Sequence, residues 1–362
     1  MLFLTKRVKH DFLEACEHIQ QGSFRLRTPE GEVFDFGQGC PQAEMTIRDW
    51  SVVTAIAARG DIGFGETYVA GLWDTPSIMD LATVALHNFD QFEGFAYPDF
   101  WNNLKYKVVN RILRANSVKG SSRNIRAHYD VGNEFYQLWL DESMTYSSAL
   151  FAKGDTDLAR GQYRKYDRIL NRLGDGERVL EIGCGWGGFA EYAALHRGLR
   201  LTCLTISQEH FNYAVKRIEK AGLSDRVEIK LQDYRDEQGT YDGIASIEMF
   251  EAVGEKYWPV YFDAVRNLLK PGKHATLQII TVQDARWDVY RRGVDFIQKY
   301  IFPGGMLPSP KALRAEVERG GLQVARSIEF GESYSKTLRM WYDTFNDKWS
   351  EIEAMGFDDR FR

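Results

Sequence analysis

The chain has 362 residues, of which 44% are hydrophobic and 27% are charged, and its formal net charge is −5. This composition is typical of a globular protein, and the length suits two domains better than one. The acidic balance argues against nucleic acid as the main partner.

The cysteines and the N-terminus indicate a cytoplasmic protein. The four cysteines show neither the spacing of a disulfide framework nor that of a metal site, so we expect a reduced compartment and no metal. The N-terminus has no apolar stretch long enough for a signal peptide, and no run approaches the roughly 20 apolar residues of a membrane span. Any membrane contact is therefore expected to be local and peripheral, at the inner face of the membrane.

The first 95 residues are predicted to form a small α+β domain without a catalytic cluster. A lipid-handling or docking module is one interpretation, and a scaffold or dimerisation domain, which would make the protein a homodimer, is the other. The expected elements are a helix at 10–20, a hairpin at 24–36, mixed signals at 45–60, and a glycine-rich segment at 60–88 that ends in a helix capped at Thr75-Pro76.

Residues 96–126 differ from the segments on either side in their charge. They carry seven Lys or Arg residues and a single acid, Asp99, and their apolar residues recur at helical spacing. A basic amphipathic helix with aromatic residues suits the surface of an anionic membrane. The alternative is a connecting helix with a solvated basic face.

The remaining residues, 127–362, contain a strand–turn–helix–strand unit from Arg178 to Ser207. Glycines 183, 185, 187 and 188 crowd one turn between a short strand and a helix. Glycine lets the backbone approach a ligand and adopt positive φ, and the start of a helix offers unpaired N–H groups. The spacing, E-x-G-x-G-x-G, differs from the dinucleotide fingerprint and resembles motif I of S-adenosylmethionine (SAM) methyltransferases. A nucleotide site or a structural tight turn is the alternative.

Further strands and helices alternate along this part of the chain. Strands are expected at 178–182, 201–206, 227–233, 241–248 and 274–281, with a helix before the last strand that Pro271-Gly272 ends. This order predicts an α/β fold with an open, doubly wound, mostly parallel sheet. Ligands of such sheets bind at the carboxyl ends of the strands. The residues expected there are Glu181, Ser207, Asp233, Glu251 and Ile280.

The C-terminal part is predicted to cover an apolar site. Residues 297–310 are apolar but punctuated by proline and glycine, which is typical of a lid or a pocket mouth. A helix is expected at 309–321, and a long amphipathic helix at 333–356 that begins with the turn SYSKT.

Six ordered motifs give the chain a specific resemblance over almost its whole length. They are HYDVGNEFYQLWLDESMTYSSALF, VLEIGCGWGGFA, LTISQEH, SIEMFEAVG, IFPGGMLPS and SYSKTLRMW. The chain resembles the cyclopropane-fatty-acyl-phospholipid synthase family, whose members use SAM to modify cis double bonds of membrane acyl chains. The resemblance implies a class I SAM methyltransferase domain with a smaller N-terminal domain.

The resemblance also implies which residues bind the cofactor. Tyr146 and Ser147 resemble the contacts to the methionine part of SAM, and Thr205 and Ile206 those to the ribose. His210 and Tyr234 stand where the family commonly has Gln and Trp, the latter beside the adenine. The implied cofactor site is Tyr146, Ser147, Glu181, Gly183, Gly185, Gly187, Thr205, Ile206, His210, Asp233 and Tyr234.

The implied catalytic residues depart from the family in two places. The family is thought to hold a bicarbonate, which accepts the proton lost from the acyl chain, with a Cys, a Glu, a His, a Tyr and a backbone amide near an Ile. Glu251, Ile280 and Tyr334 match this set, but Ser148 replaces the Cys and Gln278 the His. Because Gln cannot titrate, this departure places bicarbonate binding and ring closure in question.

The sequence therefore predicts SAM-dependent methyl transfer to the cis double bond of unsaturated acyl chains in phospholipids. The product is a methylene- or methyl-branched chain or a cyclopropane, and a reductase is a possible partner. The expected partners are phospholipid acyl chains and the anionic membrane surface. A non-catalytic SAM- and lipid-binding paralogue and a methyltransferase for a small soluble substrate are the alternatives.

Overall fold

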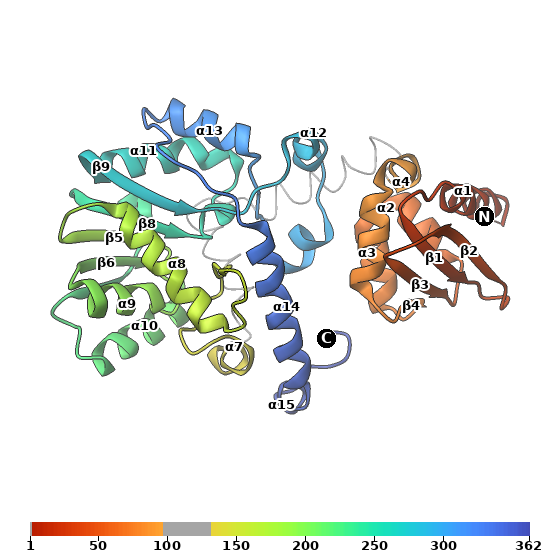
Figure 1. The fold of residues 1–362 in the computed structure, drawn as a ribbon, viewed down its shortest axis with the longest axis horizontal. Helices are drawn as coiled ribbons and strands as arrows, with labels where there is room; N and C mark the ends of the chain where they lie inside the picture. Colours follow the sequence, from red (N-terminus) through yellow and green to blue (C-terminus); the bar gives the residue numbers. More distant parts are fainter. Residues whose placement is uncertain (1, 97–131) are drawn as a thin grey trace. The chain divides into compact units, whose positions relative to one another are not determined.

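A computed structural model describes residues 2–96 and 132–362, which divide into two compact units (Figure 1). One unit contains residues 2–96 together with 292–301 and 359–362, and the other contains residues 132–291 and 302–358. Apart from Ala96, the basic helix predicted at 96–126 lies outside the described residues.

The N-terminal unit is an α+β domain, as predicted. Its sheet has the order β2-β1-β3-β4; β1 and β2 form the expected antiparallel hairpin, and β3 adds to β1 in parallel. Its elements are α1 (Leu2–Glu17), β1 (Gly22–Arg27), β2 (Val33–Gln38), β3 (Gln42–Ile47), α2 (Ser51–Val69), β4 (Trp73–Asp74), α3 (Ile78–His87) and α4 (Phe89–Ala96).

Two predictions for this unit were wrong in detail. Helix α2 runs through the glycine-rich segment, with one non-helical residue at Gly60 (φ 57°), because its apolar residues pack into the core of this unit. Helix α3 is capped by Ser77, whose hydroxyl accepts from the N–H of Asp80, and not at Thr75-Pro76. A serine oxygen that satisfies a free N–H of the first turn defines the start of the helix.

Part of the predicted lid belongs to the N-terminal unit. Residues Ile297–Ile301 form a short π-helix. The N–H of Phe296 donates to Asp61 (2.8 Å), and Lys299 pairs with Glu66 (2.5 Å). A side chain at Gly65 would collide with the ring of Phe296. The remainder of the predicted lid, 302–310, belongs to the other unit.

The larger unit contains the predicted doubly wound sheet. Its five strands are all parallel and have the order β7-β6-β5-β8-β9, so successive strands are added on one side of β5 up to β7 and on its other side from β8 onward. Such a switch point is where open α/β sheets bind ligands. The strands are β5 (Arg178–Ile182), β6 (Arg200–Thr205), β7 (Val227–Leu231), β8 (Tyr241–Ile247) and β9 (Leu269–Gln278).

Strand β9 differs from the prediction at both ends. It begins directly after helix α11 (Trp258–Leu268) and carries Pro271-Gly272 inside it, because a register shift beside Tyr241 and Gly243 of β8 accommodates the extra residues. It ends at Gln278, three residues earlier than expected. Gln278 therefore lies at the carboxyl edge of the sheet.

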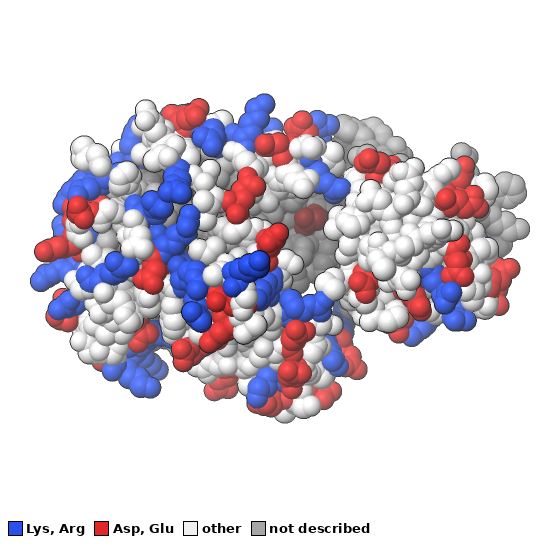
Figure 2. Space-filling model, in the orientation of Figure 1, with Lys and Arg blue, Asp and Glu red and all other residues white. Residues whose placement is uncertain are grey.

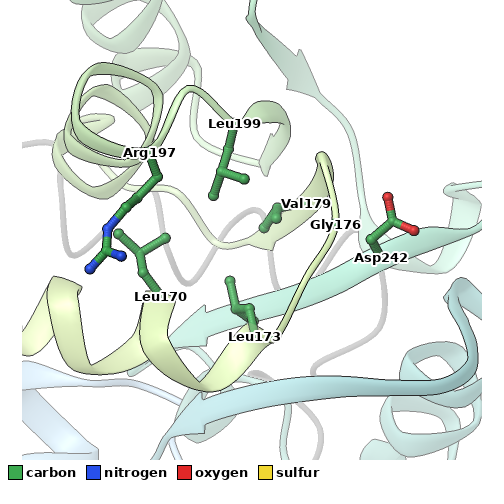
Figure 3. Close-up of a pocket in the computed structure, with 8 residues that line it drawn as sticks. Leu170, Leu173, Gly176, Val179, Arg197, Leu199 and Asp242 are labelled. Carbon is green, nitrogen blue, oxygen red and sulfur yellow. The ribbon is translucent and has the colours of Figure 1, made fainter.

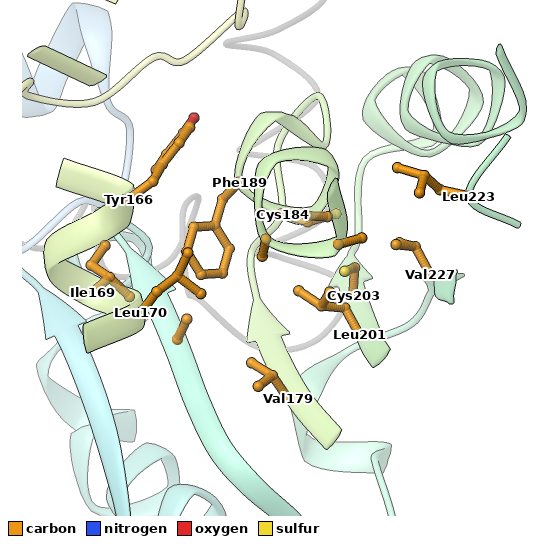
Figure 4. Close-up of a cluster of buried hydrophobic side chains, with 14 of the residues drawn as sticks. Tyr166, Ile169, Leu170, Val179, Cys184, Phe189, Leu201, Cys203, Leu223 and Val227 are labelled. Atoms are coloured by element: carbon orange, nitrogen blue, oxygen red, sulfur yellow. The ribbon is translucent and has the colours of Figure 1, made fainter. Parts of the chain in front are cut away.

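Helices cover both faces of this sheet (Figure 1). Helices α8 (Leu158–Leu173), α9 (Gly188–Arg197) and α10 (Gln208–Lys220) cover one face, and α11 and α13 (Pro310–Arg319) the other. Figure 4 shows the core under the first face, where Phe189 and Ile169 meet Val179 and Leu201 of the strands. Alternate residues of β5 point to opposite faces of the sheet. Leu180, the residue after Val179, therefore belongs to a second core, under α11 and α13.

An aromatic cluster lies beyond the sheet, between α7 (Asn133–Trp139), α14 (Gly331–Asp347) and α15 (Trp349–Ala354). Helix α7 lies within the first of the six motifs, HYDVGNEFYQLWLDESMTYSSALF. The predicted C-terminal helix is two helices that meet at Lys348. Helix α14 begins at Gly331, so the SYSKT motif lies inside the helix and not in a turn before it.

The surface has a basic region, although the net charge of the chain is negative. Figure 2 shows Lys and Arg side chains gathered over α8, where Arg160 and Arg172 are exposed, whereas both signs mix on the N-terminal unit. In the two described stretches, 2–96 and 132–362, no helix is long and apolar enough to cross a membrane.

Candidate active site

The glycine turn predicted to bind the cofactor lies at the carboxyl end of β5, beside the switch point. Gly183, Gly185 and Gly187 all have positive φ (85°, 51° and 82°), and α9 begins at the next residue, Gly188. The N–H groups of Gly183 and Cys184 donate to the carbonyl of Leu204 on β6, which fixes the turn to the sheet.

This turn fits SAM. A Cβ added to Gly185 would meet no protein atom within 4 Å, so the backbone is open to a ligand there. Glu181 is buried just before the turn; burial raises its pKa to about 8, and its Oε2 has no hydrogen-bond partner among the described residues. An orphaned carboxyl oxygen and an exposed glycine backbone at a helix start suit a polar, cationic ligand.

The predicted ribose and adenine residues follow β6 and β7. Thr205 accepts from the N–H of Ser207, whose own hydroxyl caps α10 at His210. The His210 ring packs edge-on against Trp186, with 4.4 Å between ring centroids. Ile206, which lies between Thr205 and Ser207 in the chain, is half-buried.

Asp233 and Tyr234 also lie at this edge of the sheet, but both already have protein partners. Arg235 holds the Asp233 carboxylate through two side-chain hydrogen bonds of 2.7 Å. The Tyr234 ring packs against Tyr261 in the second core.

Tyr146 and Ser147 lie in the loop that leads to α8. The Tyr146 ring is surrounded by aromatic side chains, among them Trp139 and Trp341 with centroids at 5.5 and 5.2 Å. Ser147 is buried and its Oγ accepts a hydrogen bond of 2.7 Å from Lys165 of α8. The structure thus directs Ser147 toward a buried lysine that the sequence did not indicate.

Helix α14 fixes the same loop from the other side. The N–H of Ala149 donates to Oγ1 of the fully buried Thr337 (3.0 Å), which donates in turn to the carbonyl of Ser333 (2.8 Å). The N–H of Phe151 donates to the Ser333 hydroxyl (3.1 Å). These bonds position Ser148, which lies between Ser147 and Ala149.

We expect Thr337→Val to destabilise the protein by about 1–3 kcal/mol, because it keeps the shape of the side chain but leaves the Ala149 N–H buried and unpaired. Thr344→Val is the matched control, since Thr344 makes the same bond to the preceding turn of α14 but is exposed. Urea unfolding of the two variants measures the difference. Equal stabilities would mean that Thr337 does not hold the loop.

A polar cluster forms where β8 and β9 end beside this loop. Oε1 of Glu248 accepts from the backbone N–H of Ser148 (2.9 Å) and from Nε2 of Gln278 (2.7 Å). The same Nε2 donates to the carbonyl of Ser148 (3.1 Å), and the N–H of Glu248 donates to the carbonyl of Gln278. The predicted residues Ser148 and Gln278 are therefore brought together, and Glu248 joins them.

Glu251 and Ile280 complete this side of the cluster. Oε1 of Glu251 accepts from the N–H of Ile280 (2.5 Å), and its Oε2 has no partner among the described residues. Burial, and then the charge of Glu248, raise the pKa of Glu251 to about 8. The N–H of Met306 donates to the Glu251 carbonyl, which ties residues 302–310 to the site.

Tyr334 approaches the same carboxyl groups from α14. Burial raises its pKa, and the charges of Glu248, Tyr146 and Glu251 act in the same direction. Burial and the charge of Glu248 raise the pKa of Tyr146 to about 12. Tyr146, Glu248, Glu251, Ile280 and Tyr334 are all half-buried, so part of each residue remains accessible to a ligand.

Sequence reasoning missed Glu248 and Lys165. Glu248 follows β8 directly at the switch point, and that position was the signal that could have identified it. Lys165 reads as one of several basic residues on α8, yet it is buried, and burial lowers its pKa to about 7 against the opposing charges of Glu248 and Asp141.

Bicarbonate, the ion that the resemblance implies, does not fit these residues. The N–H of Ser148 and the Nε2 of Gln278 already donate hydrogen bonds to Glu248. The Ser148 hydroxyl donates to the carbonyl of Ala149, and Glu251 takes the Ile280 N–H. The protein's own carboxylates thus occupy the Gln278 amide and the Ile280 N–H, two of the groups that would hold the ion.

A small cavity lies at the opposite end of the sheet and is not part of this site. Figure 3 shows Leu170, Leu173, Val179 and Leu199 around it. It opens beside Asp242, at the amino end of β8, whereas the predicted residues gather at the carboxyl ends of the strands.

Comparison with known proteins supports the resemblance. The family described as mycolic acid cyclopropane synthetase matches residues 116–362. Tuberculostearic acid methyltransferase UfaA1 of Mycobacterium tuberculosis is 38% identical over 316 residues, which cover 84% of this chain and 73% of that protein. The cyclopropane-fatty-acyl-phospholipid synthase of Escherichia coli K12 is 33% identical over 328 residues, or 90% of this chain and 82% of that protein.

The solved structures agree. Mycolic acid cyclopropane synthase CmaA1, complexed with SAH and CTAB, has a TM-score of 0.61 and 28% identity, with 66% of this chain and 88% of that chain covered. The predicted class I SAM methyltransferase fold and SAM as the cofactor are confirmed. The chain belongs to the mycolic acid cyclopropane synthetase family and is a SAM-dependent methyltransferase of lipid modification.

Proposed function

We propose that the protein methylates the cis double bond of unsaturated fatty acyl chains in membrane phospholipids and that its product is a methylene- or methyl-branched chain. The observation that carries the proposal is the pair Ser148 and Gln278, which binds a protein carboxylate at the place where the resembling family keeps a thiol and an imidazole. A relative that is a methyltransferase by name, at 38% identity, supports the branched product.

The surroundings of the polar cluster suit an acyl chain. Tyr146, Trp341 and Phe302 bring aromatic rings to the site, and Ile280 and Met306 add aliphatic surface. Apolar side chains beside a few polar groups suit a hydrocarbon chain and help to exclude water. Water exclusion is needed because the reaction leaves positive charge on the chain.

The side chains of the polar cluster have separate roles in this reaction. Bound SAM supplies a sulfonium methyl group that the π bond of the acyl chain attacks, which leaves a carbocation on the chain. The carboxyl groups of Glu248 and Glu251 and the rings of Tyr146 and Tyr334 stabilise that charge. A proton lost from the transferred methyl group gives a cyclopropane directly, or a methylene branch after a hydride shift.

Expression of the protein in a bacterial host, followed by mass spectrometry of total fatty acids, tests the proposal. We expect a species heavier by about 14 mass units than the unsaturated precursor that carries a methylene branch, or a saturated methyl branch where a reductase acts afterwards. A ring in this species would favour the alternative, a cyclopropane synthase, to which the matching Glu251, Ile280 and Tyr334 also point. No new species with SAM-binding protein would favour a non-catalytic paralogue.

The double variant Ser148→Cys with Gln278→His should raise the ratio of ring to branch, because it restores the thiol and the titratable imidazole. The same fatty acid analysis measures the ratio, with each single variant as a control. If parent and double variant both gave the cyclopropane alone, the two replacements would be neutral and the branched product wrong.

Action on membrane lipids would place the protein at the inner face of the membrane as a peripheral protein. The basic residues predicted to contact anionic lipid, within 96–126, lie outside the described part, and the exposed arginines of α8 are a second basic surface. Membrane binding, a homodimer and a reductase partner stay predictions.

A further inference from the structure

We propose that the carboxylate of Glu248 is the base that takes the proton from the acyl carbocation, in place of a bound bicarbonate. This inference rests on the proposed methyl transfer to acyl chains, but it holds for either product. It follows from how Glu248 is held, from the charges around it and from its backbone conformation.

Burial raises the pKa of Glu248, but its hydrogen bonds and the charge of Lys165 favour the anion. Oε1 receives two hydrogen bonds, from the Ser148 N–H at 2.9 Å and from Gln278 Nε2 at 2.7 Å. The orientation of the Gln278 amide is fixed, because its Nε2 also donates to the carbonyl of Ser148 (3.1 Å). In the flipped orientation the amide oxygen, an acceptor, would face that carbonyl, which is also an acceptor. Bonds to the charged form favour that form.

The groups around Glu248 differ in sign and come from four elements. Lys165 of α8 favours its negative charge, whereas Glu251, which follows β8, opposes it. Tyr146, in the loop before α8, and Tyr334, on α14, are neutral phenols. Glu251 has one N–H donor, while Glu248 has two donors and the lysine. Two neighbouring carboxyl groups in such different surroundings take different roles, and here Glu248 is the ionised one.

The step is balanced without another reactant. A C–H bond of the transferred methyl group breaks and its electron pair forms the new C–C bond of the ring, or the C=C bond of the methylene branch. The proton binds to the Glu248 carboxylate and leaves later to water.

The backbone of Glu248 is strained, which sets this residue apart. Its φ is 47°, and Met144 is the other non-glycine residue with positive φ within 2–96 and 132–362. Strain at a site is kept where function requires the side chain. Glycine would relieve it, and would open a space next to the donors of Ser148 and Gln278.

The test compares Glu248→Gln and Glu248→Gly in purified protein with unsaturated phospholipid vesicles and SAM. We expect Glu248→Gln to lose about 100-fold or more in product formation, as is typical of a general base, with SAM affinity unchanged. Glu248→Gly should lose as much but regain at least roughly tenfold on addition of bicarbonate or formate, because a small carboxylate can enter the space. Added bicarbonate should leave the parent and Glu248→Gln unaffected.

Controls separate the possible failures. Glu228→Gln, at an exposed carboxylate of β7, should match the parent. A parent that makes no product would contradict the proposed function, whereas an active parent that needs bicarbonate, or an active Glu248→Gln variant, would overturn the role of Glu248. A Glu251→Gln variant that loses more activity than Glu248→Gln would assign the base to Glu251.

The pH dependence of the rate distinguishes a base from a residue with a purely structural role, because only the pKa of a base sets the acid limb of the profile. Lys165→Met removes the positive charge that favours the ionised Glu248, so the acid limb of the rate profile should move to higher pH. The profile of Glu248→Gly with saturating formate should not move when Lys165→Met is added to that variant, because the rescuing ion carries its own pKa. An acid limb at the same pH in parent and Lys165→Met would contradict the proposed coupling.

Discussion

Gly185→Val should reduce SAM affinity by roughly 100-fold or more. The φ of Gly185 is 51°, and the space next to its Cα contains no protein atom. A valine would therefore put its branched side chain where the ligand approaches the backbone, and it would disfavour the conformation of the turn. Isothermal titration calorimetry of the purified variant with SAM measures the loss.

Gly222→Val is the control for this experiment. Gly222 also has positive φ (69°) and open space around it, but it follows helix α10, away from the glycine turn. Both variants carry similar backbone strain, so only Gly185→Val should affect SAM. Unchanged SAM affinity in a folded Gly185→Val variant would contradict the assignment of the cradle.

The ligand-free protein should lose stability as the pH rises from about 5 to about 7. Burial raises the pKa of Glu181 to about 8, well above the ordinary value of 4.5 that the unfolded chain has. The folded state therefore retains a proton that the unfolded state releases, and this contribution is full below pH 4.5 and disappears as the pH approaches 8. Glu251 changes in the same direction.

The expected size is on the order of 1 kcal/mol for each pH unit and each group. Lys165 acts in the opposite direction only above its pKa of about 7, so the lower window reports on the carboxyl groups whose pKa burial raises, Glu248 among them. Urea unfolding across this window should show a smaller slope in Glu181→Gln than in the parent. Glu228→Gln, which changes an exposed carboxylate, should keep the parental slope; an unchanged slope in Glu181→Gln would show that Glu181 is ionised when folded.

Local signals in the sequence were sufficient for the sheet and the cofactor turn. Strand β5 has the predicted bounds, because its apolar run is bounded by charged residues and by Gly183. Gly183, Gly185 and Gly187 carry positive φ, a conformation that glycine adopts without a steric cost. Such features depend on neighbours in the chain, and a sequence displays them directly.

The polar cluster could be predicted only in part, because it depends on contacts between distant segments. Ser148 and Gln278 stood out as departures from a family pattern, but their common partner is 100 residues from the one and 30 from the other. Nothing in the sequence distinguishes Lys165 from the exposed basic residues of α8, because its burial depends on the contact between this helix and the loop of Ser147. Pro271-Gly272 suggested an interruption before the last strand, and only pairing with β8 shows that the strand passes through it.

The left-handed backbone at Glu248 has a consequence for engineering. A non-glycine residue in this conformation costs about 1–3 kcal/mol, and the buried carboxyl group adds to the cost. A screen for heat resistance would therefore favour glycine at position 248, and the hardier enzyme that it selects would be a slower one.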